Sequence, residues 1–197
     1  MSGKQFSDCR KRKVRMMSLL FLLVAVAVST VVAQPCVAPI GVRNLAKYGK
    51  VSQSSSYSAN SHPQLAIDGN NDSIYSQGSC THTKKDDKPW WRLEMDRSER
   101  IGVIAITNRK DCCQERLKGV LVTVGDSPDH NNPVCAEITD VTPNKITVCC
   151  NGMPGRFVTI INPRPDYMTL CEVEVFRNIE QESLQLEEEE IKPESYE

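Results

Sequence analysis

The sequence lacks the patterns that mark several common classes of protein. Between residues 40 and 178 there is no strong helical period, the 197-residue chain has no Cys-x-x-Cys pair, and no stripe of Lys and Arg is interleaved with aromatic residues. The first absence argues against a helical fold, and the second leaves no cysteine spacing that fits a zinc site. No pair of carboxylates stands out as the flanks of a glycosidase pocket. We therefore expect that the protein is not an enzyme.

Charge is divided unevenly along the chain, although the formal net charge is only −1. Residues 1–33 carry six Lys or Arg and one Asp, and residues 179–197 carry eight Glu and one Lys, which leaves 17 basic and 16 acidic residues in 34–178. A nearly neutral central region argues against nucleic acid as a partner. The acidic tail at 179–197 has few large apolar residues, and its self-repulsion predicts that it is disordered.

The first 33 residues have the composition of a targeting segment. Six basic residues precede an apolar run at 16–32, and Val31-Val32-Ala33 offers small residues for cleavage before Gln34. This pattern predicts a signal peptide over residues 1–33, followed by an N-terminal arm over 34–41, and hence a secreted protein. The alternative is an uncleaved signal anchor, because a run of about 17 residues is near the lower limit for spanning a membrane.

Cysteine usage favours an oxidising compartment. Nine cysteines are present, and Cys9 lies in the segment that cleavage would remove. An even number then remains, which is typical of a disulfide framework in an extracellular protein. These eight cysteines are Cys36, Cys80, Cys112, Cys113, Cys135, Cys149, Cys150 and Cys171.

Short apolar and β-branched runs recur along the central region. Trp91, Leu93 and Met95 alternate with polar residues, as in a half-buried strand, and both Trp90 and Trp91 are expected in the core. Turn signals rich in Pro, Asn and Gly separate the runs. This pattern predicts an all-β fold, a two-sheet β-sandwich of jelly-roll type. Further strands are predicted at 101–107, 120–125, 146–148, 156–161 and 171–176.

The segment at residues 65–73 is a turn-rich acidic loop. It contains Asp68-Gly69 and Asn70-Asn71, which favour tight backbone geometry. Two interpretations stay open from these residues alone. The segment is either a plain surface loop or a calcium loop, since Asp, Asn and carbonyl oxygens are ligands that calcium prefers.

One histidine and two arginines have a distinctive spacing. Twenty-six residues separate His82 from Arg109, which opens an Arg-x-Asp-x-x-x-x-Arg run that ends at Arg116 and contains Cys112-Cys113. An imidazole and two guanidiniums can hydrogen-bond a polar ligand that carries hydroxyl oxygens. Asp111 lies between the arginines and can hold their planes in place.

Nine short segments in this order carry a family resemblance. They are Asn44-Leu45-Ala46, Ala66-Ile67-Asp68-Gly69-Asn70, Gly78-Ser79-Cys80-Thr81-His82, Pro89-Trp90-Trp91-Arg92, Thr107-Asn108-Arg109, Asp111-Cys112-Cys113, Glu115-Arg116, Gly155-Arg156-Phe157-Val158 and Leu170-Cys171-Glu172-Val173-Glu174-Val175. Together they resemble the F-type lectins, the fucose-binding lectin family of eel agglutinin. The resemblance implies a discoidin-like or galactose-binding-like β-sandwich, a lectin domain over residues 42–178.

For the site, the resemblance implies that His82, Arg109 and Arg116 hydrogen-bond terminal α-L-fucose, with Asp111 as an orienting residue. Cys112–Cys113 would form a vicinal disulfide that serves as an apolar platform against the sugar face. Side chains at the rim would lie near the methyl group of the sugar. The rim candidates are Tyr57, His62 and Tyr75.

The resemblance also implies a structural calcium ion and further disulfides. Cys80–Cys171 would join the sugar loop to the last strand, and Cys135 would pair with Cys150. Cys36 and Cys149 are left without an assigned partner, and they either bridge each other or link two chains. The calcium ligands would be the carbonyls of Leu65, Asn70 and Cys171 and the side chains of Asp68, Ser79 and Glu172.

We therefore expect a secreted, calcium-containing lectin that binds fucosylated glycans in innate recognition or defence. Membrane contact is expected only through glycans or an uncleaved signal anchor. Weak binding at a single site favours a homo-oligomer, which gains avidity from several sites. The alternative function is a discoidin-like extracellular adhesion module that binds phospholipid or protein through apolar loop tips.

Overall fold

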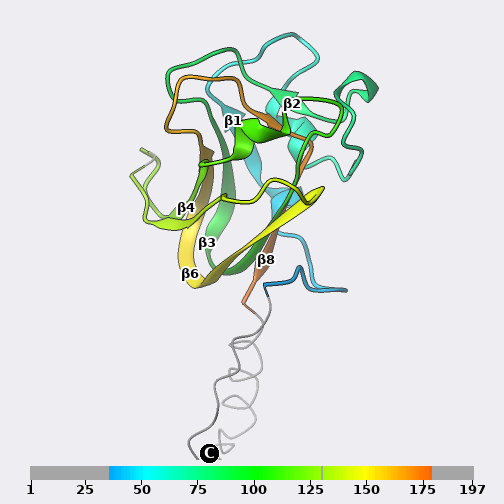
Figure 1. Ribbon diagram of the computed structural model, residues 1–197. Helices are drawn as coiled ribbons and strands as arrows, with labels where there is room; N and C mark the ends of the chain where they lie inside the picture. Colours follow the sequence, from blue (N-terminus) through cyan, green and yellow to red (C-terminus); the bar gives the residue numbers. More distant parts are fainter. Residues whose placement is uncertain (1–35, 130, 179–197) are drawn as a thin grey trace, which may run out of the picture. The chain divides into compact units, whose positions relative to one another are not determined.

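The computed structural model describes residues 36–129 and 131–178 (Figure 1). The predicted signal peptide at 1–33, the start of the N-terminal arm and the predicted disordered tail at 179–197 lie outside these residues. Within them the regular structure consists of strands and short 3-10 helices, and no helix there is long and apolar enough to cross a membrane. The predicted all-β fold class is confirmed. The elements are η1 (Ala46–Tyr48), β1 (Lys50–Gln53), η2 (Pro63–Ala66), η3 (Tyr75–Gln77), β2 (Thr81–His82), β3 (Trp90–Thr107), η4 (Gln114–Leu117), β4 (Leu121–Gly125), β5 (Val134–Glu137), β6 (Lys145–Ile161), β7 (Thr169–Leu170) and β8 (Glu172–Arg177).

Two long strands form the frame of the domain. β3 pairs antiparallel with β6 along almost its whole length, and the two strands run side by side in Figure 1. The first half of β3 also pairs with β1, and its second half pairs with β8. The second half of β6 pairs with β4, which pairs with β5. One layer therefore has the order β1-β3-β6-β4-β5, and the other layer has β8-β3-β6.

The continuity of β3 and β6 differs from the sequence prediction. The hydrophobic pattern predicts two separate strands in each region, because polar residues interrupt the apolar runs. In the structure a register shift between Glu94 and Glu99 bends the pair, yet Glu99↔Gly155 and Arg100↔Pro154 are still partners. A bulge lets a strand bend while backbone pairing continues on both sides. The hydrophobic pattern alone therefore does not locate the end of either strand.

The two layers pack face to face through one hydrophobic cluster. It combines Trp91 and Leu93 from the first half of β3 with Val173 from β8, and all three side chains are fully buried. The expected core position of Trp91 is confirmed, and its indole Nε1 donates to the Pro63 carbonyl at 3.0 Å. Trp90 is only half-buried. Burying a large apolar side chain contributes about 1.5–3 kcal/mol, so this cluster is what stabilises the predicted two-sheet sandwich.

Disulfides link distant parts of the domain. The three pairs that the resemblance implies are present, namely Cys80–Cys171, Cys112–Cys113 and Cys135–Cys150. A fourth joins Cys36 to Cys149, with Cα atoms 5.5 Å apart. The two cysteines without an assigned partner thus bridge each other within the chain. This bond fastens the described part of the N-terminal arm to β6.

A small second sheet positions the residues expected at the binding site. β2 pairs with β7, so that His82 lies opposite Thr169. The disulfide Cys80–Cys171 joins the residues that flank these two strands, and both cysteines are fully buried. The amide of Cys171 also donates to the carbonyl of Thr107 at 3.0 Å, at the end of β3. The strand that carries His82 therefore lies beside the arginine loop (residues 109–116), which follows β3.

Candidate functional site

His82 stands at the centre of the site as a buried, neutral imidazole. The residue is 6% exposed, and its Nδ1 lies 2.7 Å from the carbonyl oxygen of Thr83. Because a carbonyl can only accept, we assign the ring proton to Nδ1. Burial lowers the pKa of His82 below its usual 6.5; the Thr83 hydrogen bond opposes this shift, and the charges of Arg116 and Arg109 add to it. Nε2 is therefore an unprotonated acceptor at neutral pH.

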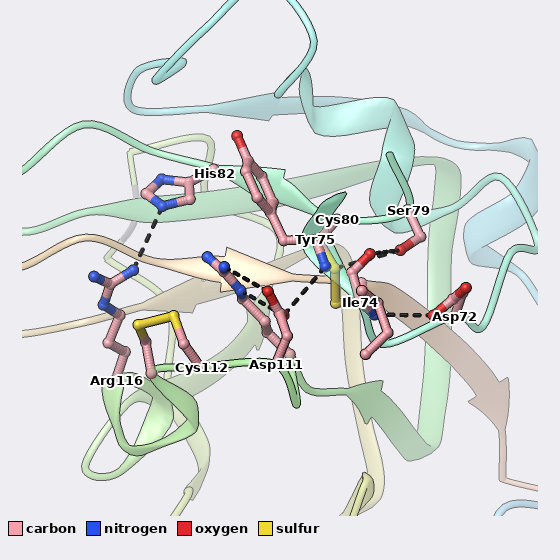
Figure 2. Close-up of polar contacts among 12 residues, drawn as sticks. Asp72, Ile74, Tyr75, Ser79, Cys80, His82, Asp111, Cys112 and Arg116 are labelled. Carbon is pink, nitrogen blue, oxygen red and sulfur yellow. Dashed lines mark hydrogen bonds and ion pairs between the residues drawn. A yellow bond between two sulfur atoms is a disulfide. The ribbon is translucent and has the colours of Figure 1, made fainter. Parts of the chain in front are cut away.

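Arg116 faces this acceptor. Its Nη1 lies 3.4 Å from Nε2 of His82 and donates toward it (Figure 2). The guanidinium carbon of Arg116 lies 4.9 Å from the ring centroid of Tyr167, and its Nε lies 4.0 Å from Oδ1 of Asp166. The sequence suggests that Asp111 holds both arginines, but Arg116 is positioned by Tyr167 and Asp166 instead. The reason is that β7 brings these two residues next to β2.

Asp111 holds Arg109. The Nε and Nη2 atoms of Arg109 each donate to one carboxylate oxygen at 2.8 Å, which makes a bidentate pair. The amide of Tyr75 donates to the same carboxylate at 3.2 Å, and the Arg109 guanidinium lies 4.5 Å from the Tyr75 ring centroid. The hydrogen bonds from Arg109 lower the pKa of Asp111 to about 2. The carboxylate therefore stays charged near neutral pH and fixes the plane of this guanidinium.

The arginine loop is fastened by two buried asparagines. Nδ2 of Asn108 donates to the carbonyl of Gln114 at 3.0 Å, and Nδ2 of Asn162 lies 3.5 Å from the carbonyl of Arg116. Within the loop Cys112–Cys113 forms the vicinal disulfide, with Cys113 in the left-handed backbone region at φ 59°. Figure 2 shows this disulfide beside Arg116. The loop thus offers a half-buried sulfur surface next to a guanidinium.

Three tyrosines surround His82. The ring centroids of Tyr57, Tyr75 and Tyr167 lie 4.7, 5.3 and 5.5 Å from that of the imidazole. Tyr57 is 56% exposed and presents an open ring at the rim. Of the rim candidates from the sequence, Tyr57 and Tyr75 are brought to the site. The exposed His62 has no ring contact with His82 in the described part of the chain.

Tyr167 and Asp166 are site residues that sequence reasoning missed. They come just before β7, whose antiparallel pairing with β2 places them beside His82. An isolated β-bridge between Asp86 and Asp166 continues this alignment. The signal that predicts their position is the implied disulfide Cys80–Cys171, because it brings the residues before the second cysteine alongside those after the first.

The site combines a neutral acceptor, two sets of donors and a sulfur surface. The charge of Arg109 is offset by Asp111, whereas the carboxylate nearest to Arg116 among the described ion pairs is that of Asp166, at 4.0 Å. A hydroxyl group suits this arrangement, because it can donate to Nε2 of His82 and accept from a guanidinium at the same time. A fully ionised anion can only accept, so it offers Nε2 no donor. The geometry therefore favours a neutral ligand with several hydroxyl groups.

Among the implied calcium ligands, Asp68 and Glu172 lie close together where the 65–73 loop approaches β8. Among residues 36–129 and 131–178, no group of three or more His, Cys, Asp or Glu side chains is placed to hold a metal. The implied set needs only the carboxylates of Asp68 and Glu172, since carbonyl and hydroxyl oxygens supply the rest. Glu172 is 2% exposed, and its Oε2 accepts from the amide of Gly69 at 3.2 Å. The pKa of Glu172 is raised to about 7, chiefly by burial; the hydrogen bond from Gly69 opposes this shift and the charge of Asp68 adds to it.

The loop carries oxygen donors of the kind that calcium prefers. The amide of Asn70 donates to Asp68 Oδ1 at 2.8 Å, and two more turns of this kind follow, through Asn70 and Asp72. The buried hydroxyl of Ser79 donates to the carbonyl of Ile74 at 3.1 Å, which leaves its oxygen lone pairs available (Figure 2). A buried carboxylate beside a second one is stabilised by a divalent cation. The residues present therefore fit calcium.

Comparisons with known proteins show which family this chain resembles. The family model of the NedA-like, galactose-binding domain matches residues 65–160. Fucolectin-6 of Anguilla japonica is 38% identical over 171 residues, which cover 84% of this chain and 92% of that protein. A fucose binding module of Streptococcus pneumoniae, SpX-3, has a TM-score of 0.64 and 30% identity, and the match covers 70% of this chain and 99% of the module.

A solved structure of an F-lectin, or fucolectin, from the serum of Morone saxatilis (striped bass) has a TM-score of 0.66 and 42% identity. The match covers 72% of this chain and 49% of the bass chain, so this chain spans about half the length of that protein. These relatives are lectins and not enzymes, as the sequence predicts for this chain. On identity and coverage together, the chain belongs to the fucolectin family, the F-type lectins.

Proposed function

We propose that the protein is a lectin that binds terminal α-L-fucose through His82, Arg109 and Arg116, with the Cys112–Cys113 disulfide as an apolar platform. The observation that carries this proposal is that Nε2 of His82 lies 3.4 Å from Nη1 of Arg116, while Nδ1 of the same ring lies 2.7 Å from the Thr83 carbonyl oxygen. The names of the relatives, a fucolectin and a fucose binding module, support the same ligand.

Fucose suits this arrangement because it has one polar edge and one apolar face. An axial hydroxyl, a neighbouring equatorial hydroxyl and the ring oxygen share the polar edge. One hydroxyl would donate to His82 and accept from Arg116, while Arg109 would donate to the remaining oxygens. A sugar that lacks the axial hydroxyl leaves buried donors unpaired, which costs about 1–3 kcal/mol for each donor. The site therefore selects an arrangement of hydroxyl groups rather than a charge.

A structural calcium ion is part of the proposal. Its ligands would be Asp68, Ser79 and Glu172, with carbonyl oxygens of the same loop and of Cys171. Ser79 precedes Cys80, and Cys80 and Cys171 form the disulfide that flanks β2 and β7. The ion would therefore stabilise the frame that holds His82. The high pKa and burial of Glu172 support it, since a nearby cation stabilises the charged form of the carboxyl.

The proposal also places the protein outside the cell. The four disulfides within the described residues support an oxidising compartment. A secreted lectin of this kind would recognise fucosylated glycans on glycoproteins or microbial surfaces in defence. Because few groups contact one sugar, useful avidity would come from a homo-oligomer. Sedimentation velocity of the mature chain measures that oligomeric state.

Fucose binding by site variants tests the central claim. In isothermal titration calorimetry with methyl α-L-fucoside, His82→Ala and Arg109→Ala should each lower the affinity at least tenfold, because each loses more than about 1.4 kcal/mol of hydrogen bonding. Two matched variants serve as controls. His62→Ala removes an exposed histidine, and Arg97→Ala removes an arginine whose side chain is 73% exposed. Both should bind as the natural sequence does.

Two outcomes would contradict the site assignment or the ligand. If His82→Ala leaves the affinity for fucoside unchanged, His82 is not part of the binding site. Binding to vesicles of phosphatidylcholine and phosphatidylserine, without binding to fucoside, favours the discoidin-like adhesion module instead. Circular dichroism of each variant establishes that the fold survives the substitution.

Chelation tests the calcium ion separately. Removing calcium should lower the thermal midpoint of the natural protein, because a ligand present at about 100 times its Kd stabilises the fold by about 2.7 kcal/mol. Glu172→Gln should abolish this calcium dependence. Glu174→Gln is the control, since that residue lies two positions along β8 and pairs with Lys145. A midpoint that does not respond to calcium in the natural protein rules the ion out and leaves the fucose assignment standing.

A further inference from the structure

A cavity opens at the end of the sandwich that faces away from the candidate site. Its volume is about 290 Å³, and it lies where η1 meets the bend of β3 and the end of β8. β3 leaves the site region at Trp90 and returns to it at Thr107, so its bend lies about 20 Å from the site at roughly 3.3 Å per residue. The charged and aromatic residues of the cavity are Arg43, Tyr48, Asp96, Arg97, Glu99 and Arg177.

Positive charge exceeds negative charge in this cavity. It contains three guanidiniums and two carboxylates. Glu99 accepts from Arg97 at 2.8 Å and from Arg177 at 2.6 Å. One carboxylate therefore accepts from two of the three arginines.

Arg43 supplies the third guanidinium. Its guanidinium carbon lies 4.3 Å from the ring centroid of Tyr48, and in the described part of the chain no carboxylate pairs with it. Both residues are exposed, and Tyr48 is 58% exposed. A guanidinium stacked on a ring still has N–H groups at its edge that can bind a carboxylate through two hydrogen bonds. The guanidinium of Arg43 can therefore bind a carboxylate through its edge.

The acidic tail begins beside this cavity. β8 ends at Arg177, and the amide of Asn178 donates to the carbonyl of Arg100 at 2.9 Å, next to the bend of β3. Residues 179–197 then carry eight Glu and one Lys. Glu180 and Glu182 follow Arg177 by three and five positions, so an extended chain carries them about 10 to 18 Å from it. Both can reach the cavity.

We propose that glutamates of the 179–197 tail bind the arginine cavity of the same chain, with Arg43 as their main contact. The short connection from Arg177 gives these carboxylates a high effective concentration at the cavity, which favours the same chain over a second copy. The attraction joins exposed charges, so salt screens it. Because the cavity and the sugar site lie at opposite ends of the domain, tail binding and fucose binding are independent.

Nuclear magnetic resonance of the full mature chain tests this contact. The probe is the side-chain Nε–Hε signal of Arg43, compared between the natural protein and a variant in which all eight tail glutamates are glutamine. The signal should differ at about 0.1 M salt and converge at about 1 M, where the screening length falls from about 10 to 3 Å. An identical Arg43 signal in the two proteins at the lower salt overturns the proposal.

Charge reversal makes the test specific. Arg43→Glu should abolish the salt-dependent shift of the backbone amide signals at positions 180 and 182. Adding Glu180→Lys and Glu182→Lys to this variant should restore a salt-dependent shift at the same two positions. Lys84→Gln removes an exposed charge from the loop after β2, next to the sugar site, and should leave the shift intact. Shifts that grow with protein concentration, with dimers in sedimentation velocity, assign the tail to a second copy and overturn the contact within one chain. Fucose affinity should be equal in the Arg43 and tail variants.

Discussion

Nη1 of Arg116 and Nε2 of His82 lie 3.4 Å apart across the candidate site. The Thr83 carbonyl holds the ring proton on Nδ1, so Nε2 presents a lone pair to the guanidinium. A hydroxyl group that enters between the two residues can donate to His82 and accept from Arg116. On the proposed function, the contact in the free protein would be replaced by two contacts to one hydroxyl group, and sugar binding would depend on the protonation state of His82.

Fucose binding should weaken in acid. The pKa of His82 is lowered from 6.5, chiefly by burial. Above pH 6.5 the ring is therefore neutral, and the affinity for fucose should not change with pH. As the pH falls through the lowered pKa, Nε2 takes a proton and can no longer accept. Asp111, with its pKa of about 2, keeps its charge over most of this range. Calorimetric titration from about pH 8 to about pH 4 measures the effect.

The contribution of His82 to the free energy of unfolding should also decrease in acid. Because the folded-state pKa of His82 lies below 6.5, the unfolded chain binds more protons, and the contribution of His82 is complete above pH 6.5 and is lost as the pH falls through the folded pKa. His82→Gln is the control, since its amide does not titrate. If the variant shows the same loss of fucose affinity in acid, a group other than His82 is responsible.

Asp111→Asn should weaken fucose binding while the fold survives. The substitution removes the charge that holds Arg109 through two hydrogen bonds of 2.8 Å. A charge-assisted contact is worth about 1.5–3 kcal/mol, which corresponds to a loss of roughly tenfold to a hundredfold in affinity. Calorimetry measures the loss, and Asp87→Asn, at an exposed position, is the matched control. Equal affinity in both variants would show that Arg109 needs no support from Asp111.

Two double serine variants should separate binding from stability. Cys112→Ser with Cys113→Ser removes the sulfur platform but closes no loop in the unfolded chain, so affinity should fall with little change in stability. Cys36→Ser with Cys149→Ser opens a bridge across 113 positions and should cost about 4–5 kcal/mol of unfolding free energy. Its fucose affinity should be unchanged. Denaturant titration and calorimetry on both variants check this contrast, and a loss of affinity confined to the second variant contradicts it.

Fucose affinity should depend on the ring of Tyr167 and not on its hydroxyl group. The ring lies under the Arg116 guanidinium at 4.9 Å and beside His82 at 5.5 Å. Tyr167→Ala should lower fucose affinity roughly twofold to fivefold, because an exposed cation–π contact is worth about 0.5–1 kcal/mol. Tyr167→Phe should bind normally. Tyr48→Ala, which removes the ring beneath Arg43, controls for the loss of an exposed aromatic residue.

Much of the fold and of the site could be predicted from local patterns. Alternation in the run around Trp91 predicts a strand with one buried face, and the number of short apolar runs separated by turns predicts the sandwich. The spacing of His82, Arg109 and Arg116 predicts a common site, which β2 and the arginine loop bring together. The long bent strands could not be predicted, because backbone pairing continues through the polar bend, where the hydrophobic pattern stops.

The sequence by itself determined the chemical groups available for binding and the cysteines available for the framework, because these depend on residue type and spacing. Only the tertiary structure decided that Asp111 holds Arg109, that Tyr167 and Asp166 hold Arg116, and that Nε2 of His82 is the acceptor. The pairing of Cys36 with Cys149 is likewise known only from the folded chain. The physical reason is that these relationships depend on side-chain direction and on contacts between segments far apart in the chain. The pairing of β2 with β7 creates such contacts, and no local pattern records them.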